Sequence, residues 1–237
     1  MHDLIVYLIV FSAAVLALFS GFGVGTILTP VFMLFFDIKL AIFFVAIIHL
    51  LNNLLKLVLF RKYIDFGILK RFGLAALVGS FIGAFGQIYM VNVALKHIIG
   101  FVLIFLGVQE WFPSKSQLRL PKSIDPVGGF LSGLLGGLIG NQGAIRSAFL
   151  LNYEISKEVF IATGVVLACL IDAVRIPVYW LSYAQTNASF WSPLIPLIIF
   201  SFLGTLVGKS LLKHFSISQF RKFVATLIVL IGIYFIF

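Results

Sequence analysis

Charged residues and cysteine are scarce in this sequence. Only 11% of its 237 residues are Asp, Glu, Lys or Arg, whereas 62% are hydrophobic. A soluble domain of this length could not cover its surface with so few polar groups, so most of the exterior must face lipid. The single cysteine, Cys169, excludes an intramolecular disulfide and a cysteine-rich metal site. The composition therefore predicts an all-α integral membrane protein that crosses the bilayer several times.

Long apolar runs mark the candidate membrane helices. A helix needs about 20 apolar residues to cross a hydrocarbon core of ~30 Å. Candidate segments are 4–20, 40–60, 74–91, 98–112, 126–139, 159–181, 192–208 and 220–237. Two further apolar pieces, 27–36 and 144–151, are too short to span alone. Segment 4–20 lacks the basic flank of a signal peptide and has a counterpart at 126–139, so we expect it in the mature protein.

The second half of the chain repeats the first. Four positions recur 125 residues later: Gly79, Gly83, Lys96 and Gly107 return as Gly204, Gly208, Arg221 and Gly232. Upstream, Gly23 and Gly25 correspond to Gly140 and Gly143, inside apolar stretches that glycines interrupt. We predict a first transmembrane repeat at 1–112, a linker at 113–125 and a second repeat at 126–237. A duplicated apolar chain with interrupted segments at matching positions is typical of secondary transporters.

Loop charges predict how the two repeats face. If each interrupted segment is a hairpin, each half adds three full crossings and the second half is inverted. Twelve loop Lys and Arg then lie on one face and two on the other, whereas a single crossing would divide them seven and seven. The positive-inside rule favours the inverted repeat, with the linker in the cytoplasm and both termini outside it. Re-entrant loops and two short crossings are both compatible with this pattern.

Three basic side chains lie inside apolar segments: Lys56, Arg146 and Arg175. An ionisable group in hydrocarbon costs roughly 2.5–3.5 kcal/mol, so such residues usually face the bundle interior and mark a substrate path. Snorkelling towards the interface is the alternative for Lys56 and Arg175. Asp172 lies three residues before Arg175, on the same helix face, so a purely structural ion pair is a second alternative.

The first repeat carries a matching polar pair. Asn53 and Lys56 are also three residues apart, on the helix equivalent to that of Asp172 and Arg175. His49 lies one turn before Asn53 and is a candidate for proton coupling, although a helix histidine is more often simply hydrogen-bonded.

The glycine-rich breaks at 21–26 and 136–143 predict a site for an anion. Glycine tolerates unwound backbone, and the short helix after each break presents free N–H groups at its positive N-terminus. The expected ligands are Gly25, Thr26, Asn141, Gln142, Gly143 and Arg146, with Asn53, Lys56, Asp172 and Arg175 beside them. Close helix packing is the alternative, and we prefer it for the Gly-x-x-x-Gly pairs at 79–83 and 204–208.

Two motifs carry a resemblance to a known family. GFGVGTILTP at 21–30 and GLLGGLIGNQGA at 133–144 resemble the paired glycine-rich turns of the sulfite exporter TauE/SafE family. The resemblance covers nearly the whole chain and implies membrane transport of sulfur-containing anions such as sulfite, sulfonates or sulfoacetate. The chain departs from the family pattern at Asn141-Gln142, in place of small residues, and at Arg146-Ser147, where a proline often lies. These departures add donors and charge where the ligand is expected.

We therefore predict a secondary transporter of small anions in the cell membrane, working by alternating access. A passive anion channel on the same scaffold is the alternative. The chain has no grouped acids and bases of the kind that catalytic sites use, so we do not expect an enzyme, a cofactor or a metal. The expected partners are a small anion and the lipid bilayer, not nucleic acid; a homodimer stays open.

Overall fold

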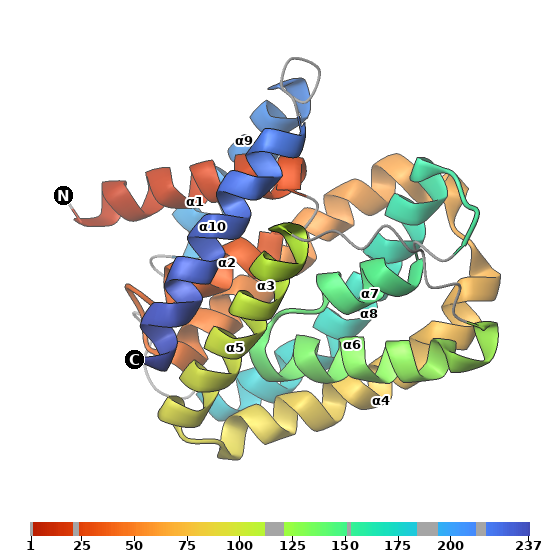
Figure 1. Cartoon of the computed structure of the whole chain (residues 1–237), viewed down its shortest axis with the longest axis horizontal. Coiled ribbons are helices and arrows are strands. Elements are labelled where there is room, and N and C mark those ends of the chain that lie inside the picture. Colours follow the sequence, from red (N-terminus) through yellow and green to blue (C-terminus); the bar gives the residue numbers. More distant parts are fainter. Residues whose placement is uncertain (1, 21–23, 112–120, 151–152, 184–193, 212–216) are drawn as a thin grey trace. The chain divides into compact units, whose positions relative to one another are not determined.

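The structure, a computed structural model, describes residues 2–20, 24–111, 121–150, 153–183, 194–211 and 217–237. These residues form helices and connecting loops and contain no strand (Figure 1). The α-helices are α1 (His2–Ser20), α2 (Val24–Phe32), α3 (Ile38–Phe60), α4 (Phe66–Tyr89), α5 (Asn92–Trp111), α6 (Asp125–Ile139), α7 (Gly143–Leu150), α8 (Lys157–Tyr183), α9 (Leu194–Leu211) and α10 (Ile217–Ile236). Two short 3₁₀ turns are η1 (Arg61–Tyr63) and η2 (Lys122–Ile124).

Among the described residues, four helices have the length and composition to cross a membrane: Ile38–Val58 of α3, Phe66–Tyr89 of α4, Asn92–Gln109 of α5 and Glu158–Tyr183 of α8. Shorter apolar stretches lie in α1, α9 and α10. Helices α2 and α7 have nine and eight residues, about 13 and 12 Å at 1.5 Å per residue, too short to span. The predicted all-α, polytopic membrane fold is confirmed.

The chain divides into two compact units, and each takes helices from both sequence halves. Unit 1 comprises residues 1–48, 90–115 and 186–237, and unit 2 comprises 49–89 and 116–185. Unit 2 therefore joins the end of α3 and all of α4 to α6, α7 and α8. The predicted repeat boundaries stay a prediction, and most of the predicted linker, residues 112–120, lies outside the described residues.

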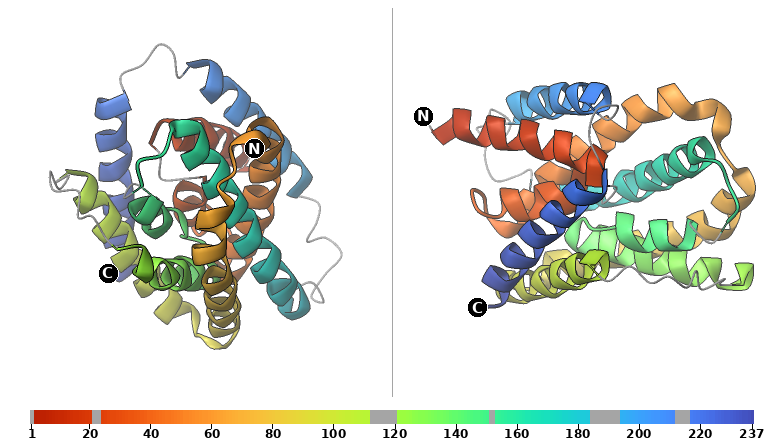
Figure 2. Two further views of the ribbon diagram at one scale, coloured as in Figure 1. Left: turned by 90° about the vertical axis from the view of Figure 1, so that its right-hand side faces the viewer. Right: turned by 45° about the horizontal axis from the view of Figure 1, so that its top comes forward.

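Glycines bring helix backbones into direct contact in both units. A Cβ at Gly79 would lie 2.1 Å from the carbonyl oxygen of Phe130, and one at Gly83 2.2 Å from that of Leu134. Helices α4 and α6 therefore lie side by side with touching backbones (Figures 1 and 2), as small-residue packing allows. In unit 1, a Cβ at Gly204 would lie 2.3 Å from the carbonyl oxygen of Phe11. Because Gly204 is the repeat counterpart of Gly79, α9 packs on α1 as α4 packs on α6.

Helices α4, α6 and α8 of unit 2 run in the same direction. The carbonyls of Phe72, Ala76 and Ser80 on α4 meet Gly129, Gly133 and Gly137 of α6 in ascending order. Between α4 and α8, Ser80 Oγ donates to the Ile171 carbonyl (2.9 Å) and Tyr183 Oη donates to Gln87 Oε1 (2.7 Å). All three helices therefore begin on one side, where the basic residues of η1 and of the first turns of α4 also lie.

Helix α7 folds back along α6, as the hairpin form of the repeat predicts. The side chain of Gln142 packs against Gly136 near the end of α6, and the ring of Phe149 packs on Gly128 near its beginning. In addition, α3 and α8 run in opposite directions. His49 in the middle of α3 meets Asp172, and the turn that follows α3 reaches the beginning of α8, where Asp65 N donates to Thr163 Oγ1 (3.0 Å). Because α3 and α8 are equivalent in the repeat, their opposite directions in unit 2 agree with an inverted duplication.

Candidate functional site

A buried polar cluster lies in unit 2, where α3, α8 and the start of α7 meet. It contains His49 and Asn53 of α3, Gln142 just before α7, and Asp172 and Arg175 of α8. Asp172 and Arg175 have no exposed surface, and Gln142 is 1% exposed. Polar groups at this depth require partners, because an unpaired one carries its full desolvation cost.

The carboxylate of Asp172 is the centre of this cluster. Its Oδ2 lies 2.7 Å from His49 Nδ1, while its Oδ1 accepts from Arg175 Nε at 2.9 Å and from Gln142 Nε2 at 3.1 Å. Arg175 Nη2 is also 2.8 Å from Oδ1. The structural ion pair that the sequence left open is therefore present, and it is joined by a histidine and an amide from two other segments.

The contact with Asp172 favours one tautomer of His49. A carboxylate only accepts, so Nδ1 carries a hydrogen and donates it to Asp172. In the neutral ring Nε2 is then an acceptor, and Asn53 Nδ2, which lies 3.2 Å from each ring nitrogen, can donate to it. A second proton on Nε2 would place two donors face to face unless the Asn53 amide turned to present its oxygen. The protonation of His49 is thus tied to the orientation of Asn53.

Side chains of α8 hold the broken end of α6. The helix ends at Gly140, whose φ of 78° is left-handed and favours glycine. Arg175 Nη1 donates to the Gly136 carbonyl (3.0 Å), and Tyr179 Oη donates to the Gly137 carbonyl. Within the hairpin, Ser132 Oγ donates to the Gln142 carbonyl (2.9 Å). Sequence reasoning missed Ser132 and Tyr179; the signal for Tyr179 is its position one turn after Arg175.

Arg175 is paired with Asp172, whereas Arg146 is a second guanidinium with donor capacity to spare. It lies in the first turn of α7, half-buried, and its Nη1 is enclosed without a hydrogen-bond partner among the described residues. Its Nε lies 3.5 Å from the Cβ position of Gly164, so a glycine on α8 leaves room for the guanidinium. Lys56 is half-buried on α3 and close enough to interact electrostatically with Arg146. Arg146 in turn lies within electrostatic reach of Asp172, a carboxylate that Arg175 already neutralises.

The remaining predicted residues fall in two places. Asn141 and Gly143 are buried next to Gln142, at the break before α7. Gly25 and Thr26 are buried at the start of α2, which belongs to unit 1. The glycines at 21–23 lie outside the described residues. Unit 2 therefore assembles nine of the predicted residues, His49 included: His49, Asn53, Lys56, Asn141, Gln142, Gly143, Arg146, Asp172 and Arg175.

Comparison with known proteins identifies the family. Neither the curated proteins nor the solved structures give a significant match. The model of the sulfite exporter TauE/SafE family matches residues 6–235, nearly the whole chain. This is a family of membrane transporters and not of enzymes, and the apolar helices agree with it. The chain therefore belongs to the sulfite exporter TauE/SafE family.

Proposed function

We propose that this protein is a secondary transporter of the cell membrane that moves small sulfur-containing oxyanions or organosulfonates by alternating access. Membership of the family supports transport of sulfur anions in general. The observation that supports the finer proposal is Arg146 at the start of the short helix α7, a guanidinium with an enclosed nitrogen that has no partner among the described residues. A planar fork of donors beside a helix N-terminus suits the oxygens of a sulfite or sulfonate group.

The residues of the cluster take different roles in this proposal. Arg146 and the N–H groups at the start of α7 bind the anion, Lys56 adds a second positive charge, and Asn141 donates a hydrogen bond. Arg175 is a positioning residue, since its Nε and Nη1 donate to Asp172 and to the Gly136 carbonyl. It fixes the end of α6 and hence the place where α7 begins. Gly25 and Thr26 would supply the equivalent helix start of the first repeat.

His49 supplies a route for proton coupling. The ionisable groups whose fields reach its ring are Asp172 and Arg175 on α8 and Arg146 on α7. Proton uptake at Nε2 would require the Asn53 amide to turn, so the proton changes the hydrogen bonding of α3 next to the anion site. Alternating access would follow from exchange between inverted repeats, which the opposite directions of α3 and α8 support.

Flux into vesicles tests the proposal. Purified protein in proteoliposomes should take up sulfite with saturation, and Arg146→Gln should raise the half-saturating concentration. Losing charge-assisted hydrogen bonds worth about 1.5–3 kcal/mol corresponds to about 10- to 150-fold. The half-saturating concentration of Arg146→Lys should lie between those of the wild type and of Arg146→Gln, because lysine keeps the charge and loses the planar pair of donors. Arg61→Gln, at an exposed basic residue of η1, is the matched control. Unchanged uptake by Arg146→Gln would overturn the assignment.

A further inference from the structure

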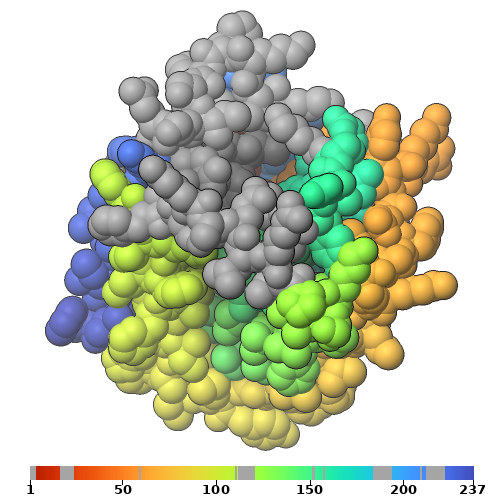
Figure 3. Space-filling view, turned by 45° about the vertical axis from the view of Figure 1, so that its right-hand side comes forward, coloured from red at the N-terminus to blue at the C-terminus, as the bar shows by residue number. Residues whose placement is uncertain are grey.

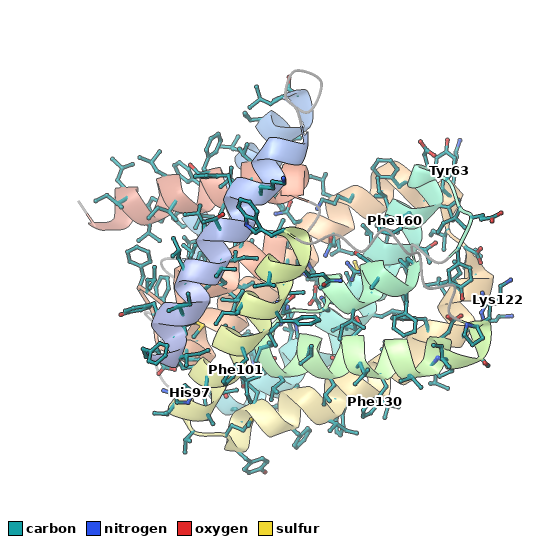
Figure 4. The ribbon with its side chains drawn as sticks, viewed as in Figure 1. Tyr63, His97, Phe101, Lys122, Phe130 and Phe160 are labelled. Carbon is teal, nitrogen blue, oxygen red and sulfur yellow. The ribbon has the colours of Figure 1, made fainter. Side chains whose placement is uncertain are left out.

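A groove between α4 and α6 of unit 2 combines an apolar wall with a basic end. It has a volume of about 470 Å³ and is lined by Lys70, Arg71, Leu74 and Val78 of α4 and by Pro126 and Phe130 of α6, among others. Figure 3 shows the surfaces of α4 (yellow) and α6 (green) next to each other, and Figure 4 labels Phe130 on α6. The groove lies on the outside of the helix pair and is separate from the polar cluster around Asp172.

The apolar wall follows from the packing of the two helices. Leu74 is 72% exposed and Val78 49% exposed, in a row at four-residue spacing that begins with Lys70. The glycines between α4 and α6 bring the backbones together, so larger side chains line the valley outside the contact. From Lys70 to Val78 the row extends about 12 Å along the helix, which accommodates part of an acyl chain.

The basic end lies at the start of α4, on the side where the loop charges gather. Arg71 Nε donates to Asp125 Oδ2 (2.9 Å), and its side chain is 38% exposed, so the guanidinium is anchored and still accessible. Lys70 is exposed. By the positive-inside rule this side is cytoplasmic, at the depth of lipid headgroups.

We propose that this groove binds an anionic glycerophospholipid, with its phosphate on Lys70 and Arg71 and an acyl chain along Leu74, Val78 and Phe130. Charge complementarity selects this occupant: Asp125 balances one of the two cations, so Lys70 and Arg71 leave a net positive charge at the end of an apolar groove, which matches a headgroup of net negative charge. A zwitterionic lipid would fill the apolar part equally but would gain less electrostatic binding energy at the basic end. The proposal is independent of the transported anion.

Native mass spectrometry and thermal unfolding of the full chain in detergent test this site. Phosphatidylglycerol should stay bound and raise the unfolding temperature more than phosphatidylcholine with the same acyl chains. Lys70→Gln should weaken the binding of phosphatidylglycerol by about fivefold, the contribution of one basic residue near a charged surface. Lys62→Gln, at an exposed lysine of η1 that does not line the groove, is the matched control.

A second variant tests the apolar part without touching a charge. Ala75→Phe fills the groove and should remove the preference for phosphatidylglycerol while the protein stays folded. Equal retention of the two lipids by the wild type, or equal effects of Lys70→Gln and Lys62→Gln, would overturn the proposal. Stabilisation by inorganic phosphate that equals stabilisation by phosphatidylglycerol would also overturn it, since the site would then recognise a free anion.

Discussion

Breaking the Asp172–Arg175 pair should destabilise the protein far more than removing Arg146. Asp172→Asn keeps the shape of the side chain but leaves the Arg175 guanidinium buried, with the Gly136 carbonyl as its remaining strong acceptor. It also takes away the carboxylate that accepts from His49 and Gln142. Removing one partner of a buried pair costs about 3–5 kcal/mol because the other charge stays uncompensated.

The loss should be visible in thermal unfolding of the detergent-purified protein. For a chain of this size each kcal/mol corresponds to about 2–4 °C, so Asp172→Asn should unfold about 6–20 °C below the wild type. The double variant Asp172→Asn/Arg175→Gln should recover part of that loss, because no buried charge is left unpaired. Arg146→Gln is the matched control and should change the midpoint by no more than a few degrees, because Arg146 Nη1 makes no hydrogen bond to any residue that the structure describes.

Two results would refute this reasoning. An unfolding midpoint of Asp172→Asn within about 2 °C of the wild type would mean that the pair contributes little, as many exposed pairs do. A double variant less stable than either single variant would mean that the two side chains act independently.

Three further predictions concern helix packing, the cytoplasmic end and proton coupling. Gly133→Ala should lower the free energy of unfolding by about 1–3 kcal/mol or more, because the added Cβ would lie 2.0 Å from the Ala76 carbonyl oxygen and overpack the helix contact. Gly73→Ala is the control and should be tolerated, because its nearest neighbours are side-chain carbons at 3.7 Å. Burial, followed by a hydrogen bond to Asp125, raises the pKa of Tyr153 above its usual 10. The neutral phenol is therefore favoured in the folded state, so the contribution of Tyr153 to the free energy of unfolding holds below pH 10 and declines above it. The unfolding midpoints of the wild type and of Tyr153→Phe should converge above pH 10, and a constant difference between them up to high pH would contradict this. His49→Gln should keep sulfite binding but lose the acceleration of uptake by a pH gradient, and an unchanged response would exclude the histidine from coupling.

The sequence predicts the repeat, the broken helices and the identity of most cluster residues, because these depend on local patterns. Glycine spacing and apolar runs are read within one segment, and Asp172 and Arg175 are only three residues apart. The bond between His49 and Asp172 joins residues 123 positions apart, so no local pattern indicates it.

The different environments of the two arginines could not be read from the sequence either. Arg146 and Arg175 both appear as single cations in apolar segments. The structure separates them because Arg175 reaches the Gly136 carbonyl, 39 residues earlier, while Arg146 faces the small residue Gly164. Pairing of α4 with α6, across the two halves, likewise depends on tertiary packing. The run Gly129, Gly133 and Gly137, at four-residue spacing, is the signal that could have indicated a close helix contact.

In the proposed transporter Arg146 binds the transported anion, and titration calorimetry of sulfite with the purified protein measures that binding without transport. The wild type should bind saturably, and Arg146→Gln should weaken binding by about 10- to 150-fold, as the loss of charge-assisted hydrogen bonds requires. A dissociation constant that does not change in Arg146→Gln would contradict the claim.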